Sequence, residues 1–124
     1  MINTARIKPL RALTELECLR LLATSNVGRL AITQDALPAL VPVQVRLEAN
    51  HLLITSLLGS AVPLHKQGVV TLETGNLGEG VGREWSVEVC GMLRREIPST
   101  LGADEAGLDD GFQLSTRKIR GWSR

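Results

Sequence analysis

The chain has 124 residues, of which 44% are hydrophobic and 22% are charged, and its formal net charge is +1. This length suits one domain with a real core, but it is small for an enzyme that encloses its substrate alone. The balanced charge gives no argument for a nucleic-acid or membrane partner. An aromatic share of 2% also disfavours stacking of bases or sugars on the surface.

The N-terminal part predicts an arm and then a capped helix. Residues 1–13 are basic, and we expect a loosely structured arm there, with a single domain over 14–124. Thr14 and Glu17 have the spacing of a capping box, in which each side chain satisfies a backbone donor of the other residue. The helix should run to about Thr24, and its buried stripe should consist of Leu16, Cys18, Leu19 and Leu22.

The remainder predicts mostly strands. Alternating apolar residues and intervening turns place these strands at 27–34, 39–48, 51–57, 69–74, 84–97 and 112–122. Tight turns are expected at 34–36 and at Ala49-Asn50, and a glycine-rich loop at 75–83. Short helices are expected near 59–67 and 99–107. In the strand at 84–97, Trp85, Val87, Val89 and Gly91 should face one side, and Ser86, Glu88 and Cys90 the other.

The second strand contains an internal proline. Pro42 cannot donate to a β-ladder, so it marks a strand edge, a bulge or a place that something other than a strand approaches. The sequence around it, Val41-Pro42-Val43-Gln44, is therefore a candidate wall of a ligand site.

Several other kinds of site are disfavoured. Cys18 and Cys90 are far apart and fit neither a disulfide framework nor a metal motif. His51 and His65 lack a third ligand at metal spacing, so we expect no metal site. No apolar run is long enough to cross a membrane, and residues 1–6 lack the apolar core of a secretory signal, so a cytoplasmic location is the expectation.

The order of these segments resembles one family. Leu-Glu-Cys-Leu-Arg-Leu-Leu, Val-Gly-Arg-Leu-Ala, Val-Pro-Val, Leu-Leu-Ile-Thr-Ser and Trp-Ser-Val-Glu-Val-Cys-Gly follow one another over about residues 14–95, as in the pyridoxamine 5′-phosphate oxidase-like proteins. The resemblance implies a mainly β, six-stranded Greek-key split barrel with a few short helices. It also implies a homodimer with cofactor sites at the subunit interface, where FMN is the usual ligand and a deazaflavin the ligand of some relatives.

The resemblance also implies which residues would hold the cofactor. Pro42, Val43 and Gln44 match the strand that lies along the flavin ring, and Trp85 matches a tryptophan of the family's Gly-Trp-Ser-Val motif. In the strand that binds the cofactor phosphate in this family, Thr55 replaces the usual arginine. Ala61, shortly after that strand, replaces the usual lysine. Ser56 and Ser60 supply neighbouring hydroxyls, and Lys66 is a candidate substitute for the missing cations.

The two replaced cations leave three interpretations open. Their loss would weaken a phosphate site by roughly 3–6 kcal/mol. The chain is then a flavin- or deazaflavin-dependent oxidoreductase of a small molecule that uses substitute cations, such as His65, Lys66, or Arg117 and Lys118 of a second subunit. Alternatively it is a cofactor-free dimeric binding module, or a haem-binding relative with His51 or His65 as axial ligand. The sequence identifies no catalytic side chain.

A dimer is also expected from the residues themselves. Four apolar side chains after the third strand have no obvious place in a monomer core, which is typical of an interface: Leu57, Leu58, Val62 and Leu64.

Overall fold

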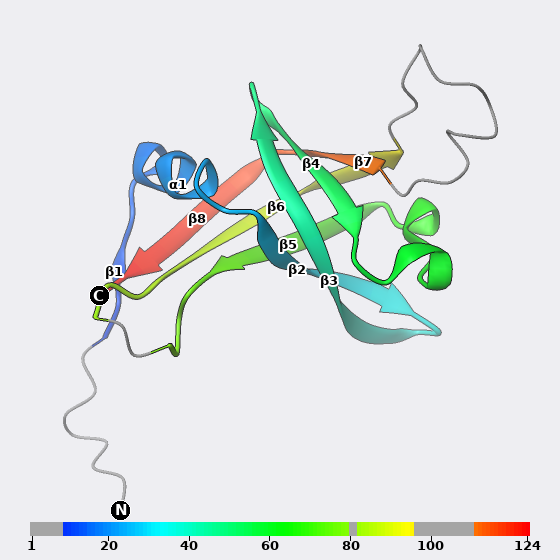
Figure 1. The fold of residues 1–124 in the computed structure, drawn as a ribbon, viewed down its shortest axis with the longest axis horizontal. Coiled ribbons are helices and arrows are strands. Elements are labelled where there is room, and N and C mark those ends of the chain that lie inside the picture. Colours follow the sequence, from blue (N-terminus) through cyan, green and yellow to red (C-terminus); the bar gives the residue numbers. More distant parts are fainter. Residues whose placement is uncertain (1–8, 80–81, 96–110) are drawn as a thin grey trace, which may run out of the picture.

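The computed structural model describes residues 9–79, 82–95 and 111–124, which form antiparallel strands and a few short helices (Figure 1). The helices are α1 (Glu15–Leu22) and the 3-10 turns η2 (Gly59–Ala61) and η3 (Leu64–Lys66). The strands are β1 (Arg11–Ala12), β2 (Val27–Gln34), β3 (Leu37–Glu48), β4 (His51–Ser56), β5 (Val69–Gly75), β6 (Trp85–Arg95), β7 (Gly111–Ser115) and β8 (Lys118–Ser123).

Six of these strands close into a barrel. The order is β6-β5-β2-β3-β4-β7, and β7 pairs again with β6, so that the ring has no break. The barrel is split along β6, where the strand changes its neighbour. Its segment 85–90 pairs with β8, whereas its segment 93–95 pairs with β7. The expectation of a mainly β, six-stranded barrel is therefore confirmed.

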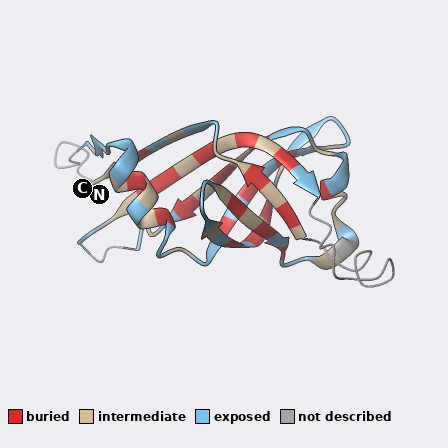
Figure 2. Ribbon diagram, turned by 90° about the horizontal axis from the view of Figure 1, so that it is seen from above, coloured by how far each residue is buried: buried red, intermediate tan, exposed pale blue. Residues whose placement is uncertain are grey.

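Alternation along the strands builds the core (Figure 2). In β6, Val87, Val89 and Gly91 are buried, as the sequence predicts. Fully buried side chains come from all six strands of the barrel, including Leu30, Val43, Ile54, Leu72, Val89 and Leu114. Because successive side chains of a strand point to opposite faces, the residues between them lie on the outside of the barrel.

Helix α1 begins with the predicted capping box. The Glu17 backbone N–H donates to Thr14 Oγ1 (3.2 Å), and the Thr14 N–H donates to Glu17 Oε1 (2.9 Å). The second bond lowers the pKa of the Glu17 carboxyl below its ordinary value, because it stabilises the charged form. The helix ends at Leu22, two residues before the predicted end.

The inner face of α1 covers β8 through Cys18. A Cβ on Gly121 would lie 2.8 Å from Cys18 Sγ, so the glycine permits this close contact. Burial raises the pKa of the Cys18 thiol, which makes it a core side chain rather than a reactive one. Leu16 is 56% exposed, so its predicted place on the buried stripe is wrong: Cys18 and Leu22 are buried, and Leu19 and Leu21 pack against the core.

Three other expectations need correction. The predicted strand at 112–122 is two strands, since the chain turns at Thr116-Arg117 and Thr116 Oγ1 donates to the Asn50 carbonyl (2.8 Å). The arm is structured where Arg11–Ala12 pairs with the end of β8. The helix expected at 59–67 is two 3-10 turns, because Pro63 separates them. The helix expected near 99–107 lies largely within the segment 96–110, outside the described residues.

The apolar residues assigned to an interface divide between core and surface. Leu64 is 2% exposed and Val62 packs against the core, which corrects that part of the expectation. Leu57 and Leu58 are about half exposed. Among the described residues, no helix is long and apolar enough to cross a membrane.

Candidate functional site

A pocket of about 370 Å³ lies on the outer side of the β3–β4 hairpin. The two-residue turn Ala49-Asn50 fixes the hairpin register, which places Gln44 opposite Thr55 and Arg46 opposite Leu53. These four side chains point outward on one face, and Asn26 and Val45 complete the lining. The Asn26 carbonyl accepts the Val45 N–H (3.0 Å), which holds the chain before β2 against the pocket.

Arg46 is the cation of this pocket, and sequence reasoning missed it. It lies diagonally across the hairpin from Thr55, the position of the family's usual phosphate-binding arginine, and such diagonal neighbours are within reach of a long side chain. Its Nη2 is 2.6 Å from Glu48 Oε1, but the two side chains are 71% and 45% exposed. An ion pair this exposed contributes little to stability, so Arg46 can exchange Glu48 for an anion that it binds more strongly. The turn at Ala49-Asn50 was the signal that would have found it.

Pro42 lies in β3, between β2 and β4, next to the point where the pairing with β4 ends. Its carbonyl accepts the Leu57 N–H (3.0 Å), so its nitrogen also faces the β4 side. The last β3–β4 pair is Val43 with Ser56. Pro42 therefore lies one residue beyond the last pair of the β3–β4 ladder, where the absence of a backbone N–H is tolerated. Its half-buried ring faces outward, as Gln44 does two residues later.

The inward positions of the same strands belong to the core. Val43 is fully buried, and Ser56 is 7% exposed with its Oγ accepting the Leu58 N–H (3.0 Å). Ser60 lies in η2, and exposed Lys66 ends η3 and does not line the pocket. The structure thus brings Gln44 and Thr55 together in one pocket, with Pro42 on the same outer face.

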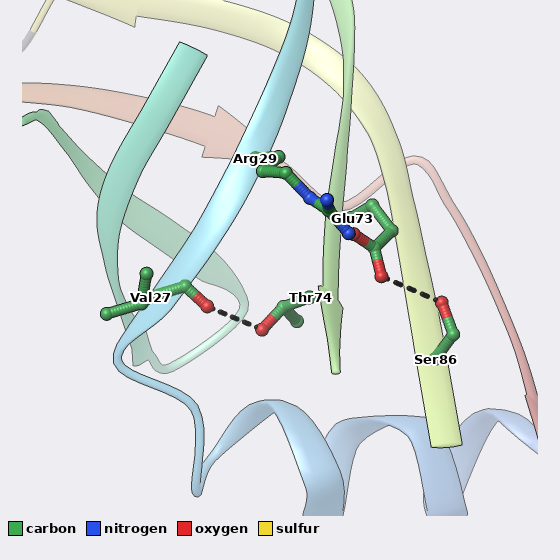
Figure 3. A network of polar contacts seen from close by, with 5 residues as sticks. All are labelled: Val27, Arg29, Glu73, Thr74 and Ser86. Carbon is green, nitrogen blue, oxygen red and sulfur yellow. Dashed lines mark hydrogen bonds and ion pairs between the residues drawn. The ribbon is translucent and has the colours of Figure 1, made fainter. Parts of the chain in front are cut away.

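Trp85 faces a different part of the molecule. It packs against the core and lines a separate cavity with Leu13 and Leu21 of the N-terminal segment. The next residue, Ser86, belongs to the outer face, where its hydroxyl donates to Glu73 Oε2 (3.0 Å) (Figure 3). The other oxygen of Glu73 accepts Arg29 Nη2 (2.8 Å).

A second hydrogen bond in Figure 3 holds the start of β2 against β5. The Thr74 hydroxyl donates to the Val27 carbonyl (2.7 Å). The Thr74 side chain is buried, whereas the Arg29–Glu73–Ser86 contacts lie on the outer side of β2, β5 and β6.

Histidines and cysteines form no cluster in the described part of the chain. His51 begins β4 and His65 is exposed on η3, and no group of three His, Cys, Asp or Glu side chains there could hold a metal ion. Cys18 and Cys90 are both free thiols.

Solved structures share this fold. The FAD binding protein from Mycobacterium smegmatis is 20% identical with a TM-score of 0.71, and the comparison covers 94% of this chain and 99% of that chain. A FAD-binding protein from Mesorhizobium loti is 23% identical with a TM-score of 0.73, over 94% and 99% of the two chains. The FAD and heme binding protein from M. smegmatis is 15% identical with a TM-score of 0.69, over 90% and 72%.

The sequence comparisons agree with the fold. No curated protein matches the chain significantly. The family model described as pyridoxamine 5′-phosphate oxidase matches residues 14–118, which is most of the sequence and includes all six strands of the barrel. The chain therefore belongs to the pyridoxamine 5′-phosphate oxidase-like family.

Proposed function

We propose that this protein binds a flavin in the β3–β4 pocket and is a flavin-dependent oxidoreductase of a small organic molecule. The observation that carries the proposal is the pocket itself, in which Gln44, Arg46 and Thr55 share one outward face. An amide, a guanidinium and a hydroxyl supply the hydrogen bonds that a flavin ring edge and phosphate require. The solved structures named above as FAD-binding support a flavin over other ligands.

Each side chain has a distinct part in this proposal. Arg46 would hold the phosphate through charge-assisted hydrogen bonds, and Thr55 would add a hydroxyl. Gln44 would orient the polar edge of the ring, while Pro42 would offer it an apolar surface without a competing N–H. A bound flavin supplies hydride or electron transfer, and the side chains position it and tune it through hydrogen bonds.

We propose FMN as the flavin because the pocket contains one arginine, which suits one phosphate group. Titration of the purified protein with FMN, FAD and a deazaflavin, followed by flavin fluorescence and visible absorption, tests this. We expect saturable binding that is tightest for FMN. Tightest binding of FAD or deazaflavin would reassign the cofactor, and saturation by none of the three would favour the cofactor-free binding module. A Soret band on haem addition, lost on replacing His51 and His65, would favour the haem-binding alternative.

We further propose that a second copy covers the outer face beside the pocket, so that the cofactor lies at a homodimer interface. Val27, Leu40 and Val69 are 53%, 66% and 64% exposed, and they lie on the outside of three neighbouring strands. Ala31 lies opposite both Leu40 and Thr71, and Val69 lies two residues from Thr71 on the same side of β5, so Leu40, Ala31 and Val69 lie near one another on this face. A surface of this kind marks an interaction site.

Leu40→Asp should convert the dimer into a monomer in sedimentation velocity at micromolar concentration, because the new carboxylate would be desolvated at the interface. Flavin binding should weaken in parallel if the second subunit completes the site. Leu16→Asp is the matched control, since Leu16 is similarly exposed but lies on α1. A monomeric wild-type protein would contradict the dimer.

A cytoplasmic location is part of the same proposal. It rests on the two free cysteines, which fit a reducing compartment.

A further inference from the structure

A second cavity, of about 380 Å³, lies at the end of the barrel between α1, the start of β6 and the end of β8. We call it the barrel-end cavity. Its apolar wall consists of Leu13, Leu21 and the half-buried ring of Trp85. It shares no lining residue with the β3–β4 pocket. Its volume and mixed apolar and polar walls are typical of small-molecule sites.

The charged lining of the barrel-end cavity is mainly positive. Four arginines and two glutamates surround it, a net charge of +2: Arg11, Arg20, Arg83, Arg124, Glu17 and Glu84. Both glutamates are already engaged. Glu17 caps α1 and pairs with Arg11 (3.6 Å). Glu84 accepts the Gly78 N–H (2.7 Å) and pairs with Arg124 (3.2 Å).

Arg20 and Arg83 are left available to a ligand. Neither side chain has a hydrogen-bond or ion-pair partner among the described residues, and both are exposed. Guanidinium groups at the mouth of an apolar cavity favour carboxylates and phosphates, which they can bind in a bidentate manner.

Ser123 adds an independent sign of an absent partner. Its hydroxyl oxygen is buried and has no hydrogen-bond partner, the one such side-chain atom among the described residues. Ser123 lines the barrel-end cavity directly. Buried polar groups are nearly always satisfied, and rotation of the Ser123 side chain toward the cavity would let this O–H donate to a ligand oxygen.

We propose that the barrel-end cavity binds a small aromatic anion, a carboxylate or phosphate ester, with its ring against Trp85 and its oxygens toward Arg20, Arg83 and Ser123. The chain's own first residues are poor occupants on charge, because residues 1–8 contain Arg6 and Lys8 and no acidic side chain. The inference is independent of the flavin proposal, since the two pockets are separate.

The two tryptophans provide an internal comparison. Trp85 lines the cavity, whereas Trp122 does not and instead lies under the Arg120 guanidinium (5.2 Å to the ring centroid). In ¹H–¹⁵N spectra of the uniformly ¹⁵N-labelled protein at low salt, titration with benzoate or phenyl phosphate should shift the Trp85 indole resonance saturably. The Trp122 resonance should move little. Which probe binds more tightly distinguishes a carboxylate from a phosphate ligand.

Charge and contact are tested separately. Benzamide, a neutral analogue of benzoate, should bind at least about tenfold more weakly, and Arg20→Gln and Arg83→Gln should each weaken benzoate or phenyl phosphate by about tenfold. Ser123→Ala should weaken binding of the same anions by less than tenfold. Arg94→Gln, which changes an arginine outside the cavity, is the control and should leave their binding unchanged. Equal binding of benzamide and benzoate, shifts that spare Trp85, or absence of saturation by either anion would overturn the proposal. Flavin titrations of the same variants should be unchanged, so the two proposals fail separately.

Discussion

Replacement of Arg46 by alanine is expected to weaken FMN binding by roughly tenfold to a hundredfold. Among the described residues, Arg46 is the only cation that lines the β3–β4 pocket, and a charge-assisted hydrogen bond is worth about 1.5–3 kcal/mol. Its present partner, Glu48, is 45% exposed, so exchanging the carboxylate for a phosphate costs little. Fluorescence titration of FMN against wild-type and variant protein measures the effect.

Three controls sharpen the test of Arg46. Glu48→Gln should leave binding unchanged or tighten it, because it removes a carboxylate that competes for the guanidinium. Arg46→Lys should lie between wild type and Arg46→Ala, since a lysine keeps the charge but loses the bidentate geometry. Arg94→Ala removes an exposed arginine outside the pocket and should have no effect. An unchanged FMN affinity in Arg46→Ala would place the phosphate elsewhere.

Replacement of Gly91 by alanine should lower the free energy of unfolding by about 3 kcal/mol. Gly91 lies where β6 leaves β8 and begins to pair with β7. A Cβ there would stand 1.7 Å from the Ser115 carbonyl oxygen, a backbone atom that no side-chain rotation can move. The Ser115 hydroxyl also accepts the Met92 N–H (2.9 Å), so a shift of this corner would break a further contact.

Chemical denaturation at one fixed protein concentration measures this loss, because dimerisation would make stability depend on concentration. Gly68→Ala is the matched control. A Cβ on Gly68 meets nothing within 4 Å and its φ is not positive, so stability should change by no more than about 0.5 kcal/mol. Equal stability of Gly91→Ala and Gly68→Ala would mean that the β7–β8 corner moves aside freely.

Local patterns predicted much of the fold. The capping box at Thr14 and Glu17 fixed the start of α1, and period-two alternation located β2 at its observed bounds. The remaining strands up to β6 begin and end within two residues of expectation where they are described. These signals lie within a few residues of one another, so they can be read without knowing the fold.

The candidate site was predictable in part. The family resemblance named Gln44 and Thr55, and the hairpin register places them opposite each other in the structure. Arg46, which the same register places on their face, was missed. Alternation correctly set Trp85 and Ser86 on opposite faces, but nothing local showed that the Trp85 side would meet Leu13 and Leu21. Those contacts join segments that are more than sixty residues apart in the chain.

The sequence by itself therefore determined the strands from β2 to β6, the start of the first helix, the turn at Ala49-Asn50 and the family. The tertiary structure decided which neighbours each face receives. At the turn between β7 and β8 the Thr116 hydroxyl donates to the distant Asn50 carbonyl, and Leu64 is buried in the core that the strands enclose. Such features follow from contacts between segments that are distant in the chain. Because these contacts form only in the folded barrel, they leave no local periodicity or capping signal in the sequence.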